Sequence, residues 1–336
     1  MSELNKIALK IISNGKGILA ADESNGTMTK RLEAVNVKST SENRLSFREI
    51  LFSSDGMKDY IGGVILYDET INQISSTGKS IPDLISSSGA VPGIKVDTGA
   101  KDLANSPKEK ITEGLDGLRD RLKKYYDLGA RFTKWRGVYS IGENYPSKLA
   151  ISSNAHALAR YSALVQENGM VPIVEPEVLM DGNHSAEVCF NKTSEVIKKC
   201  FEELILHKVD LSGIILKPNM ILSGNLSENK ISSEEVSIKT LECLKNCVPN
   251  EVPGIAFLSG GQSEIEATEN LNLINKNNNT NFIMTYSYGR ALQQSALKVW
   301  SNDIKNVEAA QTTFNHRAKM CTLAAQGKWS SELENK

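Results

Sequence analysis

The chain has 336 residues, a mass of 36.8 kDa and a formal net charge of −1, so it is long enough for one large α/β domain or two smaller ones. The near-neutral charge argues against a general binder of nucleic acid or of membrane surfaces. The five cysteines are odd in number, which favours a reduced, cytoplasmic compartment over a disulfide framework. The N-terminus lacks a signal-peptide pattern, and no apolar run approaches the roughly 20 residues that span a bilayer.

In chain order, an amphipathic helix over residues 4–12 is followed by short apolar runs that end in charged or small polar residues. Stretches long enough for a crossover helix separate most of these runs, with helices expected near 113–126, 157–164, 186–207 and 233–247. An Asn-rich connection covers 275–281, and the polar end at about 330–336 is expected to fray. The eight runs are 17–22, 62–69, 93–97, 130–136, 171–177, 213–219, 254–261 and 282–290.

Eight strand-helix units in a chain of this size predict an α/β fold, a single-domain (β/α)8 TIM barrel over residues 1–336. The alternative is an open, doubly wound parallel sheet. That fold more typically carries a glycine-rich turn after its first strand, and residues 22–27 (DESNGT) do not match it. No interdomain linker is evident.

The run over residues 213–219 ends in Lys217, which Pro218 follows directly. Because proline cannot continue a ladder and biases the preceding residue towards an extended conformation, Lys217 is predicted to be the last residue of its strand. An isolated lysine in this position would most simply extend its amine to solvent. The recurrence of charged residues at the other strand ends favours a catalytic cluster instead, since barrel active sites lie at the carboxyl ends of the strands.

Two neighbouring strands carry charges two residues apart, which places each pair on one face of its strand. Lys134 and Arg136 form one pair, and Glu175 and Glu177 form the other. If both faces look into the barrel, two cations lie beside two carboxylates, and the charges compensate each other. For any single pair, a salt bridge at the loop rim is an equally good interpretation.

The loops after the last two strands have the composition of a phosphate site. Ser259, Gly260 and Gly261 follow the seventh strand, and Gly289 and Arg290 follow the eighth. Glycines allow close approach of backbone N–H groups, and an arginine adds charge-assisted hydrogen bonds. Each glycine by itself is explained by a tight turn, but the combination at these two strands predicts a phosphorylated substrate.

A buried lysine can add to a ketone and form a protonated imine, which stabilises a carbanion on the adjacent carbon, while a carboxylate transfers protons. The four histidines show none of the H-x-H or H-E-x-x-H spacings of a metal site. No metal and no cofactor are therefore expected.

At this point the sequence resembles the class I, Schiff-base fructose-bisphosphate aldolases over nearly its whole length. The matching motifs run in order: KGILAADES (16–24), GIKVD (93–97), KWR (134–136), EPE (175–177), LKPNM (216–220), FLSGGQS (257–263) and SYGRAL (287–292). The resemblance implies the reversible, metal-independent cleavage of fructose 1,6-bisphosphate to dihydroxyacetone phosphate and glyceraldehyde 3-phosphate. It also implies a cytoplasmic homotetramer.

The resemblance also implies roles for individual residues. Lys217 would form the imine, Glu175 would be the principal acid and base, and Asp22 would polarise the C4 hydroxyl. Lys134 and Glu177 would tune the charge around the imine. The residues implied to bind substrate are Ser259, Gly260, Gly261, Ser287, Gly289 and Arg290 for one phosphate, Ser24, Thr27, Arg31, Arg44 and Lys95 for the other, and Arg136 beside them.

The sequence departs from the family at three places. Position 98 is threonine where many members have lysine, and Thr27 stands where serine is common. Many members end in a mobile tail with a terminal tyrosine that assists proton transfer, whereas this sequence ends in Glu334, Asn335 and Lys336. Slower proton exchange, or another group in that role, is the expected consequence.

Two other functions remain open at this point. One is a Schiff-base aldolase that prefers sedoheptulose 1,7-bisphosphate or fructose 1-phosphate, although the two sets of phosphate residues favour a bisphosphate. The other is a non-catalytic barrel that binds a protein partner. The presence of Lys217, Glu175 and Asp22 argues against the loss of catalysis.

Overall fold

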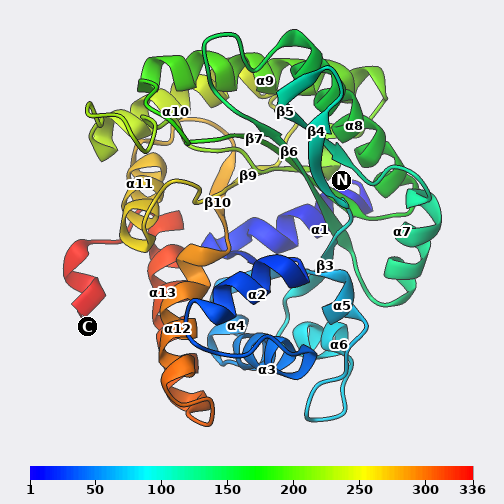
Figure 1. The fold of residues 1–336 in the computed structure, drawn as a ribbon, viewed down its shortest axis with the longest axis vertical. Coiled ribbons are helices and arrows are strands. Elements are labelled where there is room, and N and C mark those ends of the chain that lie inside the picture. The colour runs from blue at the N-terminus through cyan, green and yellow to red at the C-terminus, as the bar shows by residue number, and fades with distance from the viewer. Residues whose placement is uncertain (336) are drawn as a thin grey trace.

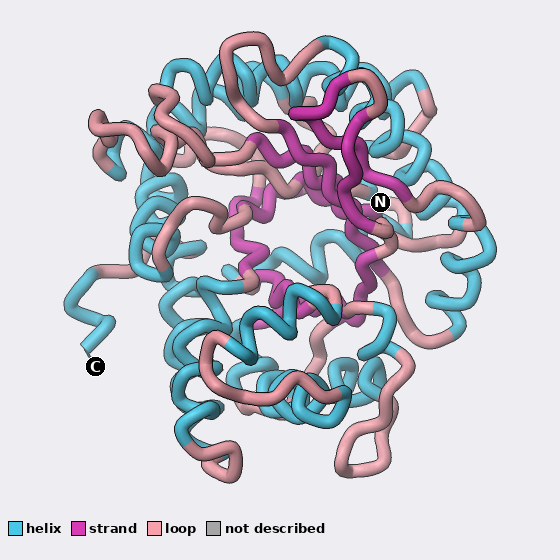
Figure 2. The backbone as a smooth tube through the Cα atoms, viewed as in Figure 1, coloured by secondary structure: helices cyan, strands magenta, loops and turns pink. Residues whose placement is uncertain are grey.

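The computed structural model describes residues 1–335, and its centre is a closed barrel of eight parallel strands in the order β1-β10-β9-β8-β7-β6-β3-β2. Figure 2 shows this ring of strands surrounded by helices, as the sequence predicts for a TIM barrel. The barrel strands are β1 Gly17–Ala21, β2 Ile61–Leu66, β3 Val91–Lys95, β6 Phe132–Tyr139, β7 Val171–Val178, β8 Ile215–Leu216, β9 Gly254–Phe257 and β10 Ile283–Tyr288.

The outer layer is built from amphipathic helices that pack their apolar side chains against the barrel (Figure 1). Serines cap many of them, and Ser232 and Ser263 form complete capping boxes with the glutamates three residues later. The larger helices after the third barrel strand are α7 Leu118–Asp127, α8 Lys148–Glu167, α9 Ala186–Leu206, α10 Ser233–Cys247, α11 Glu264–Asn277, α12 Arg290–Asn302 and α13 Val307–Ala325.

Helix α1 (Glu3–Ile12) closes one end of the barrel. Its residues Ala8, Ile11 and Ile12 belong to the same buried cluster as Phe132, Ile173 and other side chains that fill the barrel interior. The fit is close: a Cβ atom on Gly62 of β2 would lie 1.8 Å from the carbonyl oxygen of Ile11. Only glycine is compatible with this approach, and the other end of the barrel is left for the site.

Helices fill the first two connections between barrel strands, as the crossover-length separations predict. The connection between β1 and β2 contains α2 Asn25–Glu33, α3 Ser41–Phe52 and α4 Gly56–Tyr60, and that between β2 and β3 contains α5 Asp68–Ile71 and α6 Ile81–Ser87. After β3, the chain forms an antiparallel hairpin of β4 Gly99–Leu103 and β5 Ser106–Glu113, which the sequence did not predict.

The helix predicted to start near residue 113 therefore starts at Leu118, so this boundary was wrong. Glu113 pairs with Gly99 in the hairpin, and Gly114 and Gly117 have positive φ values of 128° and 63°. A left-handed backbone conformation interrupts regular secondary structure, so the helix starts only after these two glycines.

The C-terminal end is more ordered than predicted. Ser331–Asn335 form a 3-10 turn, in which Glu334 is paired with Arg317 and accepts a hydrogen bond of 2.8 Å from Trp329 Nε1. The expectation of fraying was therefore wrong for residues 331–335, while Lys336 lies outside the described residues. Among the described residues, no helix is both long and apolar enough to cross a membrane.

Candidate active site

Lys217 lies where the sequence predicts, directly after β8. Its backbone N–H donates to the carbonyl of Val174 at 2.8 Å, so pairing with β7 extends one residue beyond Leu216. The side chain of Asn219 fixes the turn after Pro218, because its Oδ1 accepts from Val178 N at 3.0 Å. These contacts hold the lysine inside the barrel mouth, where its side chain is 5% exposed.

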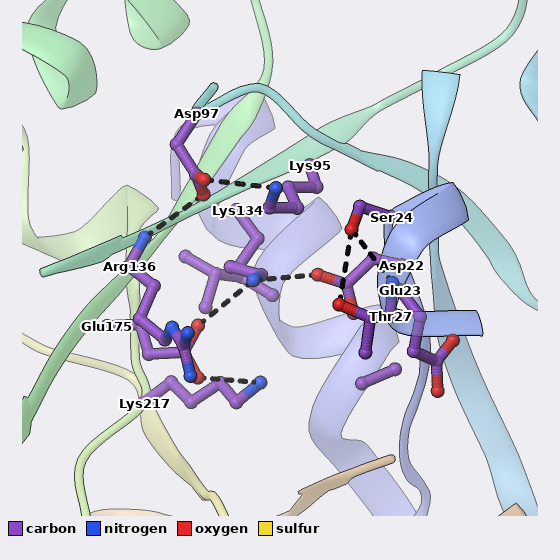
Figure 3. Close-up of polar contacts among 12 residues, drawn as sticks. Asp22, Glu23, Ser24, Thr27, Lys95, Asp97, Lys134, Arg136, Glu175 and Lys217 are labelled. Atoms are coloured by element: carbon purple, nitrogen blue, oxygen red, sulfur yellow. Dashed lines mark hydrogen bonds and ion pairs between the residues drawn. The ribbon is translucent and has the colours of Figure 1, made fainter. Parts of the chain in front are cut away.

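The lysine takes part in a chain of alternating charges drawn from four strands (Figure 3). Its Nζ lies 3.0 Å from Oε1 of Glu175, whose Oε2 lies 3.3 Å from Lys134 Nζ. Lys134 in turn lies 2.7 Å from Oδ2 of Asp22. Because burial of unpaired charges is costly, the alternation of cation and carboxylate is what allows all four groups to be buried together.

The charged groups at the centre of this chain shift one another's pKa values. Burial raises the pKa of Asp22, but the positive charges of Lys134 and Lys217 outweigh it and lower that pKa to about 2. Burial lowers the pKa of Lys134, but Asp22 and Glu175 outweigh it and raise that pKa above its usual value. Both groups are therefore charged throughout the neutral range.

Glu175 and Glu177, two residues apart on β7, have pKa values shifted in opposite directions. Burial raises the pKa of Glu175, but Lys134 and Lys217 outweigh it and lower that pKa. For Glu177, burial prevails over the attraction of Arg136, whose Nη1 lies 2.9 Å from Oε2, and the pKa is raised. Carboxyl groups whose pKa values are separated in this way are suited to different steps of an acid–base reaction.

One side of the barrel mouth has the character of an anion site. Gly289 precedes the first turn of α12, which begins at Arg290. The Leu292 N–H donates to the Gly289 carbonyl at 3.1 Å, which leaves the N–H groups of Arg290 and Ala291 without a partner among the described residues. At Gly260 a Cβ atom would lie 3.0 Å from Oε1 of Glu177, so a larger residue there would crowd this carboxylate. Within residues 1–335, the buried Ser287 Oγ has no hydrogen-bond partner.

A second set of polar groups lies across the mouth on α2 and β3. Ser24 caps α2, since its Oγ accepts from Thr27 N at 3.4 Å. Arg31 is paired with Glu23 through Nη1, while its Nε and Nη2 find no partner in the described part of the chain. Lys95 Nζ lies 3.1 Å from Asp97 Oδ1. Unsatisfied guanidinium donors in a cavity favour an anionic ligand.

A cavity of about 550 Å³ joins the two sets to the buried charges, and its size suits a small-molecule ligand. The structure brings nearly all the residues predicted from the sequence to its wall. Those that line it are Asp22, Ser24, Thr27, Arg31, Lys95, Lys134, Arg136, Glu175, Glu177, Lys217, Ser259, Gly260, Ser287, Gly289 and Arg290.

Two predicted residues lie outside this lining. Arg44 on α3 is held by Glu69, with Nη2 2.7 Å from Oε1, and so has its charge compensated within the fold. Gly261 has a φ of 77°, and a Cβ atom there would lie 2.7 Å from Cβ of Met180. Gly261 therefore shapes the loop after β9 without contributing to the cavity wall.

Three charged residues of the lining were not predicted as site residues. Glu23 directly precedes the N-cap of α2, Lys30 lies within α2, and Asp97 lies two residues after the end of β3. Asp97 was recognised as a strand-end charge, and Glu23 directly follows Asp22 in the first matching motif. The sequence indicated Lys30 only weakly. It follows Thr27 by three residues, which places both on the same face of a helix.

Comparisons with known proteins identify the family of this chain. The family model described as fructose-bisphosphate aldolase class-I matches residues 3–336. A probable fructose-bisphosphate aldolase class 1 from Xanthomonas campestris is 48% identical over 98% of this chain and 99% of its own length. The cytosolic fructose-bisphosphate aldolase 4 of Arabidopsis thaliana is 49% identical over 99% of this chain and 85% of its own.

The fold is matched equally well by a solved structure of fructose-bisphosphate aldolase from Plasmodium falciparum, in complex with TRAP and a small-molecule inhibitor. It superposes with a TM-score of 0.96 at 44% identity, covering 98% of this chain and 95% of that one. The barrel with its charged mouth is thus that of a carbon–carbon lyase. The chain belongs to the class-I fructose-bisphosphate aldolase family.

Proposed function

We propose that this enzyme reversibly cleaves fructose 1,6-bisphosphate to dihydroxyacetone phosphate and glyceraldehyde 3-phosphate, through an imine on Lys217 and without a metal ion. The observation that carries the proposal is the contact of 3.0 Å between Lys217 Nζ and Glu175 Oε1, in a cavity with anion-binding groups on opposite sides. A bisphosphate can span these two sets, which places its ketone near the lysine.

In the proposed reaction, the neutral amine of Lys217 adds to C2 of the ketose. Glu175 takes up and returns the protons needed to expel the C2 oxygen as water and leave a protonated imine. Asp22 polarises the C4 hydroxyl and Glu175 takes up its proton as the C3–C4 bond breaks. Glyceraldehyde 3-phosphate is released, and the electron pair of the broken bond passes to the imine to leave an enamine. Protonation at C3 and hydrolysis of the imine then release the ketone product.

The other charged residues have supporting roles in this proposal. Lys134 holds Glu175 and Asp22 in their charged forms and with Glu177 sets the charge around the imine. Arg136 restrains Glu177. Ser259, Gly260, Ser287, Gly289 and Arg290 bind one phosphate, and Ser24, Thr27, Arg31 and Lys95 bind the other. Gly261 supports the first set, and Arg44 acts on the second only through Glu69 and the position of α3.

The decisive experiment is reductive trapping. The protein is incubated with fructose 1,6-bisphosphate and borohydride in the presence of EDTA, and the adduct is mapped by mass spectrometry. We expect a reduced adduct on Lys217 and none in a folded Lys217→Met variant. Lys95 and Lys134 line the same cavity and serve as internal controls. An adduct on one of these lysines, or none in the folded wild-type protein, would refute the proposal.

Comparison of kcat/KM for fructose 1,6-bisphosphate, sedoheptulose 1,7-bisphosphate and fructose 1-phosphate tests the substrate. Because both anion-binding sets are present, we expect a strong preference for a bisphosphate over fructose 1-phosphate. We further propose a homotetramer, which light scattering would test. A cytosolic location is supported by the cytosolic relatives from Arabidopsis thaliana.

A further inference from the structure

Helices α8 and α9 lie on the outside of the barrel (Figure 1) and pack against each other. Together they carry two of the four histidines into one cluster. His156 lies on α8, Glu203 lies in the last turn of α9, and His207 is the C-cap directly after that helix. One potential ligand atom from each of these three side chains lies within 4.8 Å of the other two. None of the three lines the cavity that contains Lys217.

The distances suit a small tetrahedral ion. With metal–nitrogen and metal–oxygen bonds of about 2.0–2.2 Å, two ligand atoms of a tetrahedral zinc ion are roughly 3.4 Å apart. His156 Nδ1 and Glu203 Oε2 are separated by 3.2 Å, close to this value. The ring of His207 lies beside the same oxygen, with its Nδ1 3.9 Å away, and one of its ring nitrogens is within 4.8 Å of both other ligand atoms.

Contacts around the three residues already orient them. His207 Nδ1 lies 2.8 Å from the backbone carbonyl oxygen of Glu203. Because a carbonyl only accepts, this nitrogen carries the proton, and Nε2 keeps the lone pair that a metal requires. The Nζ of Lys199 lies 3.0 Å from Oε1 of Glu203, which leaves Oε2 facing His156.

We propose that His156, Glu203 and His207 bind a divalent transition-metal ion of the zinc type, at a site separate from the active site. Two imidazoles and one carboxylate are a ligand set that zinc uses in proteins, with water in the fourth position. The side chain of His156 is 51% exposed, so the ion reaches the site from solvent. Bound there, it links α8 to α9 and stabilises the folded state over the unfolded one.

Zinc and cobalt titrations of the EDTA-treated, dialysed protein test the proposal. Calorimetry gives the stoichiometry and affinity, and cobalt absorption reports tetrahedral coordination. We expect one ion per chain, and at least about tenfold weaker binding in His156→Ala and His207→Ala. The matched control is His316→Ala, because His316 also faces a carboxylate, with Nε2 3.4 Å from Glu334 Oε2, but lacks a second histidine beside it.

A Lys199→Met variant provides a test in the opposite direction. Removal of the competing cation from Glu203 should tighten zinc binding, because the carboxylate is then free to bind the metal. If Glu203 only pairs with Lys199 and does not bind the metal, the variant should leave the zinc affinity unchanged. Thermal unfolding should shift upwards with zinc in the wild type and His316→Ala, but not in His156→Ala or His207→Ala. Affinities equal in all variants, or no binding to folded wild-type protein, would overturn the proposal.

Discussion

Lys134 is the residue whose removal should show most directly what holds the buried charges together. Its Nζ lies 2.7 Å from Asp22 and 3.3 Å from Glu175, and its side chain is 6% exposed. A Lys134→Met variant keeps the bulk of the side chain but leaves two buried carboxylates with one cation, Lys217, beside them. Loss of one partner from a buried ion pair costs about 3–5 kcal/mol of the free energy of unfolding.

The part of this loss in unfolding free energy that comes from Asp22 follows from the pKa of its carboxyl group. Burial raises this pKa, but Lys134, Lys217 and Lys95 together outweigh it and lower the pKa from 3.8 to about 2, which corresponds to about 2 kcal/mol of stabilisation at neutral pH. Lys134 is the largest contributor among these cations. Because the folded-state pKa is the lower one, this stabilisation is present above pH 3.8 and is lost as the pH falls through about 2. The loss of unfolding free energy in Lys134→Met, relative to the wild type, should therefore become smaller as the pH is lowered from 5 towards 2.

The matched control is Arg119→Met, which removes the cation of a solvent-exposed pair. Arg119 Nη1 lies 2.9 Å from Glu167 Oε1, and the two side chains are 59% and 55% exposed. Exposed pairs contribute below about 1 kcal/mol. Urea unfolding followed by circular dichroism, at one protein concentration and several pH values, measures both variants. Equal losses in the two variants, or a deficit in Lys134→Met that is independent of pH, would refute the reasoning.

Three further predictions concern catalysis and the barrel. If Arg290 binds a substrate phosphate as proposed, Arg290→Ala removes a charge-assisted contact worth about 1.5–3 kcal/mol, and KM for the bisphosphate should rise roughly ten- to hundredfold. Unchanged KM and kcat would contradict this role. Glu175→Gln should lower kcat by roughly 10²- to 10⁴-fold with the secondary structure intact, as steady-state assays and circular dichroism would show. Gly62→Ala forces a Cβ atom towards the Ile11 carbonyl and should lower the melting temperature. Gly26→Ala, where no heavy atom lies within 4 Å, should leave it unchanged or raise it.

The sequence by itself determined the architecture and the identity of the central charges. Eight short apolar runs with crossover-length separations predict a parallel barrel, and the structure confirms it. Residues 134, 136, 175 and 177 could be placed in pairs, because the period of two along a strand is a local property of the backbone. The position of Lys217 followed in the same way from the proline after it.

Only the tertiary structure decided which of these charges meet. The contacts of Lys134 with Asp22 and Glu175 join residues of three strands that lie far apart in the chain, and they depend on barrel closure and register. The same holds for Arg44, whose charge is taken up by Glu69, and for His156 and His207, which show no metal spacing in the sequence. Spacing along the chain describes one element, whereas contacts between elements are set by packing.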